Sequence, residues 1–427
     1  MGFLSGVRFR ISGFASALSS TARYKLPSEA IGSKNEEPSI EVEQKVRILV
    51  LGGAGYIGKV AAYLLAKHGK AEVHVTSRSD DRARKAADEV NKRIGSAIVK
   101  YEAVDVENLD DVKRSMKNAD LVVNCVGPYY KYGIDTIKAA IDVGVRYADI
   151  CDECVAAKEI VKLDGDAKKA KTTILTSLGS GPGLSNIQVQ YSAKRMDSVT
   201  DVRIAWTSSQ TDPFGPSVMK HCLHCYSSPH QFLDGRLVQV APFSGRKLVE
   251  FPPPVGKVDV VYFDHPEVLT IPMHLKGVKN VTVRGGIFPG DIHDLIESWV
   301  KAGASLMDAY DVEGSKVAAV DFLTAVSMKI MQSKKDLPSV AAQRIEVVDK
   351  VDGGEVTHVH ASVGTMASGT VLPLFIATMM LGEGKIKVYG VLPPDAIDPD
   401  LFFEEFKQRR GAQYTQVGSM FDFRKAG

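Results

Sequence analysis

Apolar and polar residues follow two different patterns along this chain of 427 residues. Between residues 45 and 177, short apolar runs alternate with segments in which apolar residues recur every three or four positions. The first pattern is typical of buried strands and the second of amphipathic helices. Strands and helices that alternate at this spacing form βαβ units, which build a doubly wound parallel sheet of the Rossmann type. This part of the chain is therefore predicted to be α/β.

After residue 186 the pattern changes to short runs in which apolar and polar residues alternate, separated by turn residues. Such runs predict antiparallel strands, which bury one face and expose the other. We therefore expect an α+β substrate domain with a mainly antiparallel sheet. The predicted organisation is a Rossmann dinucleotide-binding domain over 45–185, the substrate domain over 186–368, and a helix returning to the Rossmann domain followed by a tail over 369–427.

A glycine-rich turn follows the first predicted strand, residues 46–51. It reads Gly53-Ala54-Gly55-Tyr56-Ile57-Gly58, and a helical run to His68 comes after it. Glycines at these spacings allow a tight turn, a close approach of the backbone to a pyrophosphate, and tight packing of helix on strand. The N-terminus of the helix adds a partial positive charge. We predict that residues 53–58 bind the pyrophosphate of a dinucleotide.

The ends of the next three strands indicate how the dinucleotide lies. Ser77 and Arg78 end the second strand, where NAD-binding proteins usually carry an acidic residue. A hydroxyl and a guanidinium suit a 2′-phosphate, so NADP is the favoured cofactor and NAD the alternative. Asp105-Val106 follows the third strand and is predicted to border the adenine. Gly127-Pro128 follows the fourth strand and is predicted to lie beside the nicotinamide ribose.

Composition narrows the possible partners and the compartment. A net charge of +2 argues against a nucleic-acid-binding protein. No apolar run reaches the roughly 20 residues that span a bilayer. Residues 1–28 contain arginine, lysine, serine and alanine but no acidic residue, which is typical of an organelle transit peptide. We expect residues 1–44 to comprise a transit peptide for a plastid or a mitochondrion and a polar linker after it; a disordered tail is the alternative.

Four of the five cysteines form two Cys-x-x-Cys pairs, Cys151/Cys154 and Cys222/Cys225. Two such pairs can bind zinc, but these are separated by many more residues than the pairs of a zinc ribbon. Cys151 also follows directly on a predicted buried strand. We therefore expect free thiols in a reducing compartment and no metal.

Six short motifs occur in order along the chain, at residues 124–130, 144–153, 179–186, 251–256, 265–272 and 390–394. Together they resemble the saccharopine dehydrogenase-like family of NAD(P)-dependent oxidoreductases. The resemblance implies a Rossmann domain with an inserted α+β domain, and hydride transfer at a CH–NH centre of an amino acid or opine. The turn Gly179-Ser-Gly-Pro-Gly183 departs from that of saccharopine reductases proper. Saccharopine itself is therefore not the expected substrate.

Four side chains of the second domain are candidates for catalysis. Arg203 and Arg284 lie on predicted strands and can bind a substrate carboxylate bidentately, although strand arginines are more often solvated. His221 and His265 can pass a proton to an imine nitrogen, although His265 can instead tie a turn together.

Asp152 and Glu153 follow the fifth predicted strand on the cofactor side. They can position an amine, or they can cap the helix that starts at Cys154. The expected function is that of an NADP-preferring oxidoreductase with a small amino-acid-like substrate. Two alternatives stay open: an NADP-binding scaffold or redox sensor without catalysis, and an oxidoreductase of another substrate class. A homodimer is compatible with the two-domain plan.

Overall fold

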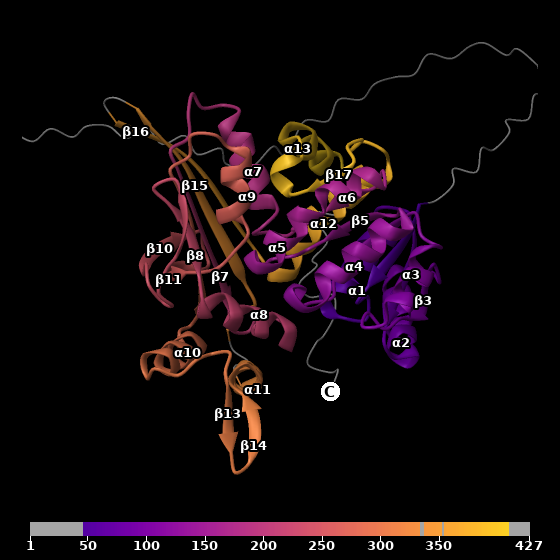
Figure 1. The fold of residues 1–427 in the computed structure, drawn as a ribbon, viewed down its shortest axis with the longest axis horizontal. Helices are drawn as coiled ribbons and strands as arrows, with labels where there is room; N and C mark the ends of the chain where they lie inside the picture. The colour runs from indigo at the N-terminus through magenta and orange to yellow at the C-terminus, as the bar shows by residue number, and fades with distance from the viewer. Residues whose placement is uncertain (1–45, 334–336, 352–353, 410–427) are drawn as a thin grey trace, which may run out of the picture.

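The computed structural model describes residues 46–333, 337–351 and 354–409. The predicted transit peptide and linker lie outside these residues, so that prediction stays a prediction. Two sheets lie beside each other, with helices between and around them (Figure 1). No helix in the described ranges is long and apolar enough to cross a membrane.

The first sheet has seven strands in the order β17-β6-β5-β4-β1-β2-β3, and every neighbouring pair is parallel. Chain order runs outward in both directions from β1, as in a doubly wound sheet. The α/β prediction of a Rossmann-type parallel sheet is therefore confirmed. The strands are β1 (Arg47–Leu51), β2 (Glu72–Ser77), β3 (Val99–Ala103), β4 (Leu121–Asn124), β5 (Arg146–Asp149), β6 (Thr173–Leu175) and β17 (Gly390–Leu392).

Helices cover both faces of this sheet. Ile48 and Val50 of β1 pack with α1, α2 and α12 on one face, and Leu49 and Leu51 pack with α3, α4 and α5 on the other. Because both faces are buried, the strand is an unbroken apolar run in the sequence. The helices are α1 (Tyr56–Lys67), α2 (Asp80–Ile94), α3 (Leu109–Met116), α4 (Tyr129–Val143), α5 (Cys154–Ile160), η1 (Val161–Leu163), α6 (Asp164–Lys169) and α12 (Met366–Gly382).

The end of the chain adds more regular structure to this region than the sequence suggested. After α12, the chain forms the edge strand β17, the short helix η2 (Pro394–Ala396) and helix α13 (Pro399–Gln408). Phe402 of α13 is fully buried in the core shared with α1 and α12. The sequence predicts only a tail after the returning helix, because the apolar residues of α13 are too few to make a strong periodic signal.

The second sheet has eight strands, and six of them follow the order β10-β11-β12-β7-β15-β16. Only β12 and β7 run parallel; the other pairs are antiparallel, which confirms the predicted mainly antiparallel sheet. The strands are β7 (Asp201–Ser209), β8 (His230–Leu233), β9 (Arg236–Gln239), β10 (Lys247–Phe251), β11 (Gly256–Tyr262), β12 (Asn280–Phe288), β15 (Ala341–Val351) and β16 (Gly354–Gly364).

Two helices of the second half, α7 (Leu184–Ala193) and α9 (Glu267–His274), pack on the face of this sheet that carries Val202 and Ile204 of β7. Helix α8 (Pro216–Ser227) lies near one end of the strands (Figure 1). Beyond α8, an arm made of α10, a two-stranded hairpin and α11 extends away from both sheets. The arm comprises α10 (Asp291–Lys301), β13 (Ala309–Val312), β14 (Ser315–Ala318) and α11 (Ala319–Ser333).

Candidate active site

The glycine-rich loop joins β1 to the N-terminus of α1. The left-handed residue of this turn is Gly52 (φ 71°), directly before the predicted motif at residues 53–58. A Cβ atom at Gly53 would lie 2.5 Å from the Val75 Cβ, and one at Gly58 would lie 2.3 Å from the Gly52 carbonyl oxygen. Neither position therefore accepts a larger residue. The loop stays close to the sheet and leaves the start of α1 open to an anion.

Helix α1 begins in a way that suits a pyrophosphate. Gly55 is its N-cap residue, no side chain caps it, and no acidic residue lies in its first turn. The backbone N–H of Ala54 donates to the Thr76 carbonyl oxygen (3.2 Å), which ties the loop to β2. Because β2 ends at Ser77, this contact brings the loop beside the residues predicted to meet the cofactor's ribose.

Ser77 and Arg78 have the chemistry that a 2′-phosphate requires. Ser77 ends β2, and the exposed Arg78 follows it directly. The pKa of Glu107, in the turn after β3, is lowered by hydrogen bonds from Lys131 and Tyr132 and also by the charge of Arg78. Residues 77–79, at the end of β2 and directly after it, are Ser-Arg-Ser and include no acidic residue. These residues fit NADP, since a carboxylate there would repel the extra phosphate.

The other two predicted cofactor contacts lie at the same edge of the sheet. The Asp105 carboxylate accepts a hydrogen bond from the Glu107 N–H (3.1 Å), which shapes the turn after β3 around Val106. Gly127-Pro128 lies between β4 and α4, directly before the first helical residue. Both turns lie beyond the carboxyl ends of their strands, which is where ligands bind on such sheets.

A cavity of about 370 Å³ lies between the two sheets. Its wall includes Ile57 from the glycine-rich loop, Ile150 and Asp152 after β5, and the turn at residues 179–182 after β6. Across from these lie residues of β7, β12 and β15, with α8 and the start of α12 completing the wall. The cavity thus adjoins the cofactor loop, and its volume is that of a small-molecule site.

His221 and Asp152 form an ion pair in this cavity. The His221 Nε2 lies 3.3 Å from Asp152 Oδ2, and its Nδ1 lies 3.6 Å from Glu153 Oε1. Burial lowers the pKa of His221, but the two carboxylates outweigh it, and the net pKa is raised. Burial raises the pKa of Asp152 to about 6 against the opposing effect of His221. Its side chain is 36% accessible, so water in the cavity moderates this rise.

Glu153 connects this pair to the start of α4. It is the N-cap residue of α5, as one reading of the sequence suggested, but its side chain makes no capping bond there. Instead its Oε2 accepts a hydrogen bond from the Tyr130 N–H (2.7 Å) in the first turn of α4. The segment after β5 is thus attached to the turn at Gly127-Pro128. This contact fixes the position of the His221 pair relative to the turn predicted to lie beside the cofactor.

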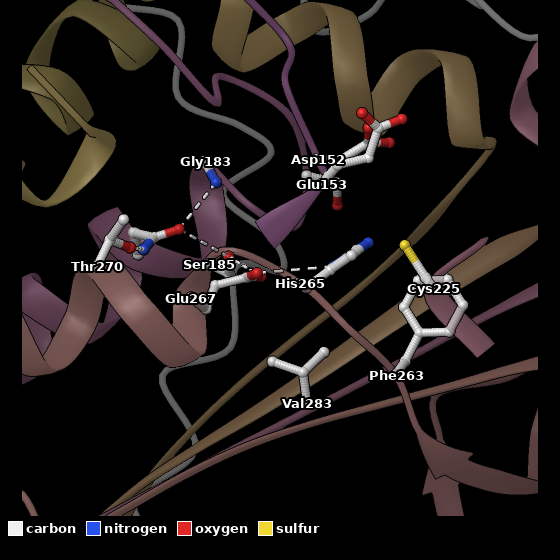
Figure 2. Close-up of polar contacts among 12 residues, drawn as sticks. Asp152, Glu153, Gly183, Ser185, Cys225, Phe263, His265, Glu267, Thr270 and Val283 are labelled. Atoms are coloured by element: carbon white, nitrogen blue, oxygen red, sulfur yellow. Dashed lines mark hydrogen bonds and ion pairs between the residues drawn. The ribbon is translucent and has the colours of Figure 1, made fainter. Parts of the chain in front are cut away.

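His265 lies beside His221 but in a different electrostatic state. The two rings are 5.6 Å apart, and the His265 Nδ1 lies 3.6 Å from Glu267 Oε2, whose carboxylate accepts a hydrogen bond from Ser185 at 2.9 Å (Figure 2). Burial, together with the charge of His221, lowers the pKa of His265 well below its usual value. Burial raises the pKa of Glu267 to about 7. His265 is therefore neutral at neutral pH.

Trp206 supports His265 from the sheet. The two rings stack with centroids 6.1 Å apart and an interplanar angle of 19°. The indole packs directly on the backbone of β12, because a Cβ atom at Gly285 would lie 2.3 Å from the Trp206 Cζ2. Glycine at position 285 is therefore what allows Trp206 to reach this place.

Arg203 and Arg284 do not reach the cavity. Arg203 pairs with Glu346 (3.4 Å) and Glu355 (3.5 Å). Arg284 donates to the Gly245 carbonyl oxygen (2.8 Å) and to Thr282 (2.9 Å), and its guanidinium stacks over the Tyr262 ring. Both lie on the face of the second sheet opposite Trp206. This placement does not support the carboxylate-binding role that the sequence suggested for them.

The two cysteine pairs do not converge on a shared ion site. Within the described ranges, the only group of three or more metal-ligating side chains whose ligand atoms lie within 4.8 Å of one another is Asp152, His221 and His265. Four buried thiols, Cys151, Cys154, Cys222 and Cys225, are free. Burial raises the pKa of each of them, so they are poor thiolate ligands at neutral pH.

Comparison with known proteins agrees with this geometry. Residues 48–175 match the saccharopine dehydrogenase NADP binding domain. This part of the chain is therefore similar to the NADP-binding domain of the saccharopine dehydrogenase-like oxidoreductases. The match includes the glycine-rich loop, Ser77-Arg78 and the turn at Gly127-Pro128, and NADP is the cofactor of this domain.

Relatives of this chain are distant. A saccharopine dehydrogenase-like oxidoreductase of Rattus norvegicus is 24% identical over 185 residues, which cover 40% of this chain and 43% of that protein. The chain thus aligns with less than half the length of this relative. A carboxyaminopropylagmatine dehydrogenase of Synechocystis sp. is 21% identical over 407 residues, 88% of this chain and 99% of that protein.

A solved structure shares the fold of this protein over most of the chain. The apo saccharopine dehydrogenase (L-Glu forming) of Saccharomyces cerevisiae superposes with a TM-score of 0.62 at 16% identity. The superposition covers 86% of this chain and 98% of that one, so both sheets are shared. The likeness concerns the fold and not the substrate.

The sequence predicts only part of this site. It indicates Asp152 as one of two readings and does not by itself mark Glu267, Trp206 or Gly285 as site residues. Glu267 lies two residues after His265 in one of the family motifs, and that spacing was the available signal. Trp206 and Gly285 meet only through the pairing of β7 with β12, which no local pattern reveals.

Proposed function

We propose that this saccharopine dehydrogenase-like oxidoreductase transfers a hydride between NADP and the carbon of a CH–NH centre, with His221 handling the proton. The observation that carries the proposal is the ion pair of His221 and Asp152 in a cavity that adjoins the glycine-rich loop. A relative along most of the chain is named as a dehydrogenase of an amino compound, carboxyaminopropylagmatine, which supports C–N chemistry.

In this proposal the cofactor lies along the carboxyl edge of the parallel sheet. Residues 53–58 and the start of α1 bind the pyrophosphate, and Ser77 and Arg78 bind the 2′-phosphate. Asp105-Val106 borders the adenine, and Gly127-Pro128 borders the nicotinamide ribose. Bound NADPH supplies the hydride in the reductive direction. The segment after β5 is held to the start of α4 by Glu153, which keeps His221 in a fixed position relative to this edge.

The proton chemistry follows from the state of His221. When hydride reaches the carbon of a C=N bond, the electron pair of the π bond moves to the nitrogen, which takes a proton from the His221 imidazolium. Asp152 and Glu153 favour that imidazolium, because both carboxylates raise its pKa. His265 has a depressed pKa and is neutral, so we assign it a positioning role beside His221. In the oxidative direction His221 takes the proton back.

The test uses variants of two histidines on α8. His221→Asn removes the proton donor, and His224→Asn, three residues along and outside the cavity wall, is the matched control. NADPH oxidation is followed with pairs of an amine and an oxo compound. We expect His221→Asn to reduce turnover by about 100- to 10 000-fold with NADPH affinity kept, and His224→Asn to stay near wild type.

The outcome also separates the alternative function. If NADPH binds, no amine and oxo compound are turned over, and His221→Asn behaves as wild type, the chain is an NADP-binding protein without this catalysis. Equal loss of turnover in both histidine variants would contradict the role of His221 as proton donor.

A further inference from the structure

The cavity wall is mostly apolar. Large apolar side chains reach it from both halves of the chain: Trp206, Phe214, Val218, Ile287, Met366 and Leu372. They come from β7, α8, β12 and α12 and from the connection before α8, so the apolar character belongs to the whole wall and not to one element. A wall of this kind favours a substrate with substantial apolar surface.

Several polar groups of the wall are already bonded within the protein. Gln343 Nε2 donates to the Ser180 carbonyl oxygen (3.2 Å), and the Ser180 hydroxyl donates to Gln343 Oε1 (3.3 Å). Thr207 donates to the Gly286 carbonyl oxygen (2.9 Å), and Ser208 donates to Asp212 (3.3 Å). Because these groups already form hydrogen bonds within the protein, a substrate gains little free energy by bonding to them.

The wall contains no cation suited to a carboxylate. Among the described residues that line the cavity, none is arginine or lysine. The ionisable groups there are Asp152, His221, His265 and the high-pKa thiol of Cys222, and Glu153, Glu267 and Asp264 lie behind them. Any imidazolium charge on His221 is already paired with Asp152 and Glu153. A substrate carboxylate would therefore lose water and meet Asp152 without a partner of its own.

We propose that the cavity takes a largely apolar substrate with no carboxylate next to the reacting C–N bond, so that the preferred oxo partner is a ketone or aldehyde and not an oxo acid. This inference rests on the proposed function and narrows its substrate class, away from the amino acids and opines that the family resemblance implied. The carboxylate binders expected for such substrates, Arg203 and Arg284, lie on the other face of the sheet.

A matched pair of probes differs in this one group: 2-hexanone, and 2-oxohexanoate, in which a carboxylate replaces the methyl group. Either one condenses with methylamine to an imine, with loss of water. Hydride from NADPH then reaches the imine carbon and one proton reaches the nitrogen, which gives the secondary amine and NADP⁺. Every reactant of this step is supplied, so turnover and binding are measured with the same two probes.

Binding is measured without chemistry. The chain has two tryptophans, so Trp299→Phe leaves Trp206, in the cavity wall, as the only one. Trp299 lies on α10 in the arm, outside that wall. Quenching of the Trp206 fluorescence in the full chain loaded with NADP⁺ then reports probe binding. We expect 2-hexanone to bind at least about 10-fold more tightly than 2-oxohexanoate. Equal or tighter binding of the oxo acid overturns the inference.

Turnover and binding separate this inference from the proposed function. Preferential binding of 2-hexanone with no NADPH oxidation for either probe supports the apolar cavity and counts against hydride transfer to this C=N bond. Faster oxidation of NADPH with 2-oxohexanoate supports the hydride transfer and overturns the substrate class. Faster oxidation with 2-hexanone supports both.

A variant pair tests whether charge is the cause. Ser362 lies on β16 at the exposed rim of the cavity, where a longer side chain can be added. Ser362→Arg supplies a cation, and Ser362→Gln supplies length without charge. We expect Ser362→Arg to reduce the preference for 2-hexanone by about 3- to 10-fold and Ser362→Gln to leave it unchanged. A preference that is the same in both variants contradicts the charge argument.

Discussion

The two faces of the eight-stranded sheet have opposite chemistry. On the cavity face, Trp206 lies over Gly285 and stacks with His265. On the far face, Arg203, Arg284, Arg344 and Lys247 surround Glu346. Residues on opposite faces are neighbours in sequence. On β12, Arg284 of the far face directly precedes Gly285, and these two residues pair with Ala205 and Trp206 of β7. Because side chains alternate along a strand, one position decides whether a residue meets the substrate cavity.

The difference shows why residue type alone is a poor guide on a strand. The space among the far-face cations is about 20 Å³, enough for about one water and not for a substrate. Two of these cations are paired within the sheet, since Arg344 and Arg203 both contact Glu346. Far-face arginines thus bond within the sheet, while no described residue that lines the cavity is arginine or lysine, and the cavity contains the His221–Asp152 pair.

We expect the largest effect on turnover from substitution of Asp152, the acidic residue in the cavity wall. Asp152→Asn removes the charge that favours the His221 imidazolium, and we expect turnover in the reductive direction to fall by about 100-fold or more. Glu346→Gln on the far face is the matched control and should leave turnover within about 2-fold. Steady-state NADPH oxidation measures both. A similar loss in both variants would erase the distinction between the faces.

The pH dependence of the reductive rate tests the roles of Asp152 and His221. If His221 donates the proton as we propose, reduction requires ionised Asp152 and protonated His221. The rate should fall as pH drops through about 6, where Asp152 takes a proton, and should fall again as pH rises through the raised pKa of His221. Each unit beyond these limits costs about 10-fold. In Asp152→Asn the upper limb should move to lower pH, because the supporting charge is gone. If the fall in rate at high pH occurs at the same pH in Asp152→Asn as in wild type, a group other than His221 causes that fall.

Gly285→Ala should break the packing of the cavity face. The added Cβ would lie 2.3 Å from the Trp206 ring, so the indole must move and His265 loses its stacking partner. We expect a loss of about 1–3 kcal/mol in the free energy of unfolding and about a 10-fold loss in turnover. Urea denaturation and steady-state kinetics measure the two effects. The double variant with Trp206→Phe should recover part of the stability, and failure to do so would place the strain elsewhere.

The Rossmann half could be predicted from sequence because its information is local. The glycine-rich loop and Ser77-Arg78 follow one strand each, and parallel strands bring their carboxyl ends to one edge whatever the details of packing. The predicted motif begins at Gly53, whereas the left-handed residue of the turn is the preceding Gly52, because the sequence does not distinguish these two adjacent glycines.

The cavity half could not be predicted to the same depth. His221 and His265 were identified and lie 44 positions apart in the chain, yet their rings are 5.6 Å apart in the fold. The partner that defines each of them, Asp152 for one and Glu267 for the other, follows from how α8 and the β11–α9 connection meet the end of β5. Whether an arginine on β7 or β12 faces the cavity depends on sheet register, which the sequence leaves open.

The smallest effect on turnover should come from the far face itself. Arg284→Met removes hydrogen bonds to Gly245 and Thr282 and the stacking on Tyr262, which should cost about 1–3 kcal/mol in the free energy of unfolding. Arg203→Met removes ion pairs that are about a third exposed and should cost about 1 kcal/mol or less.

Turnover with either 2-hexanone or 2-oxohexanoate should stay within about 2-fold of wild type in both variants, because neither guanidinium contacts the cavity. Urea denaturation and steady-state kinetics on the same preparations separate stability from function. A loss of more than about 10-fold with 2-oxohexanoate alone would show that one of these arginines does bind a carboxylate, and that the far face takes part in substrate binding.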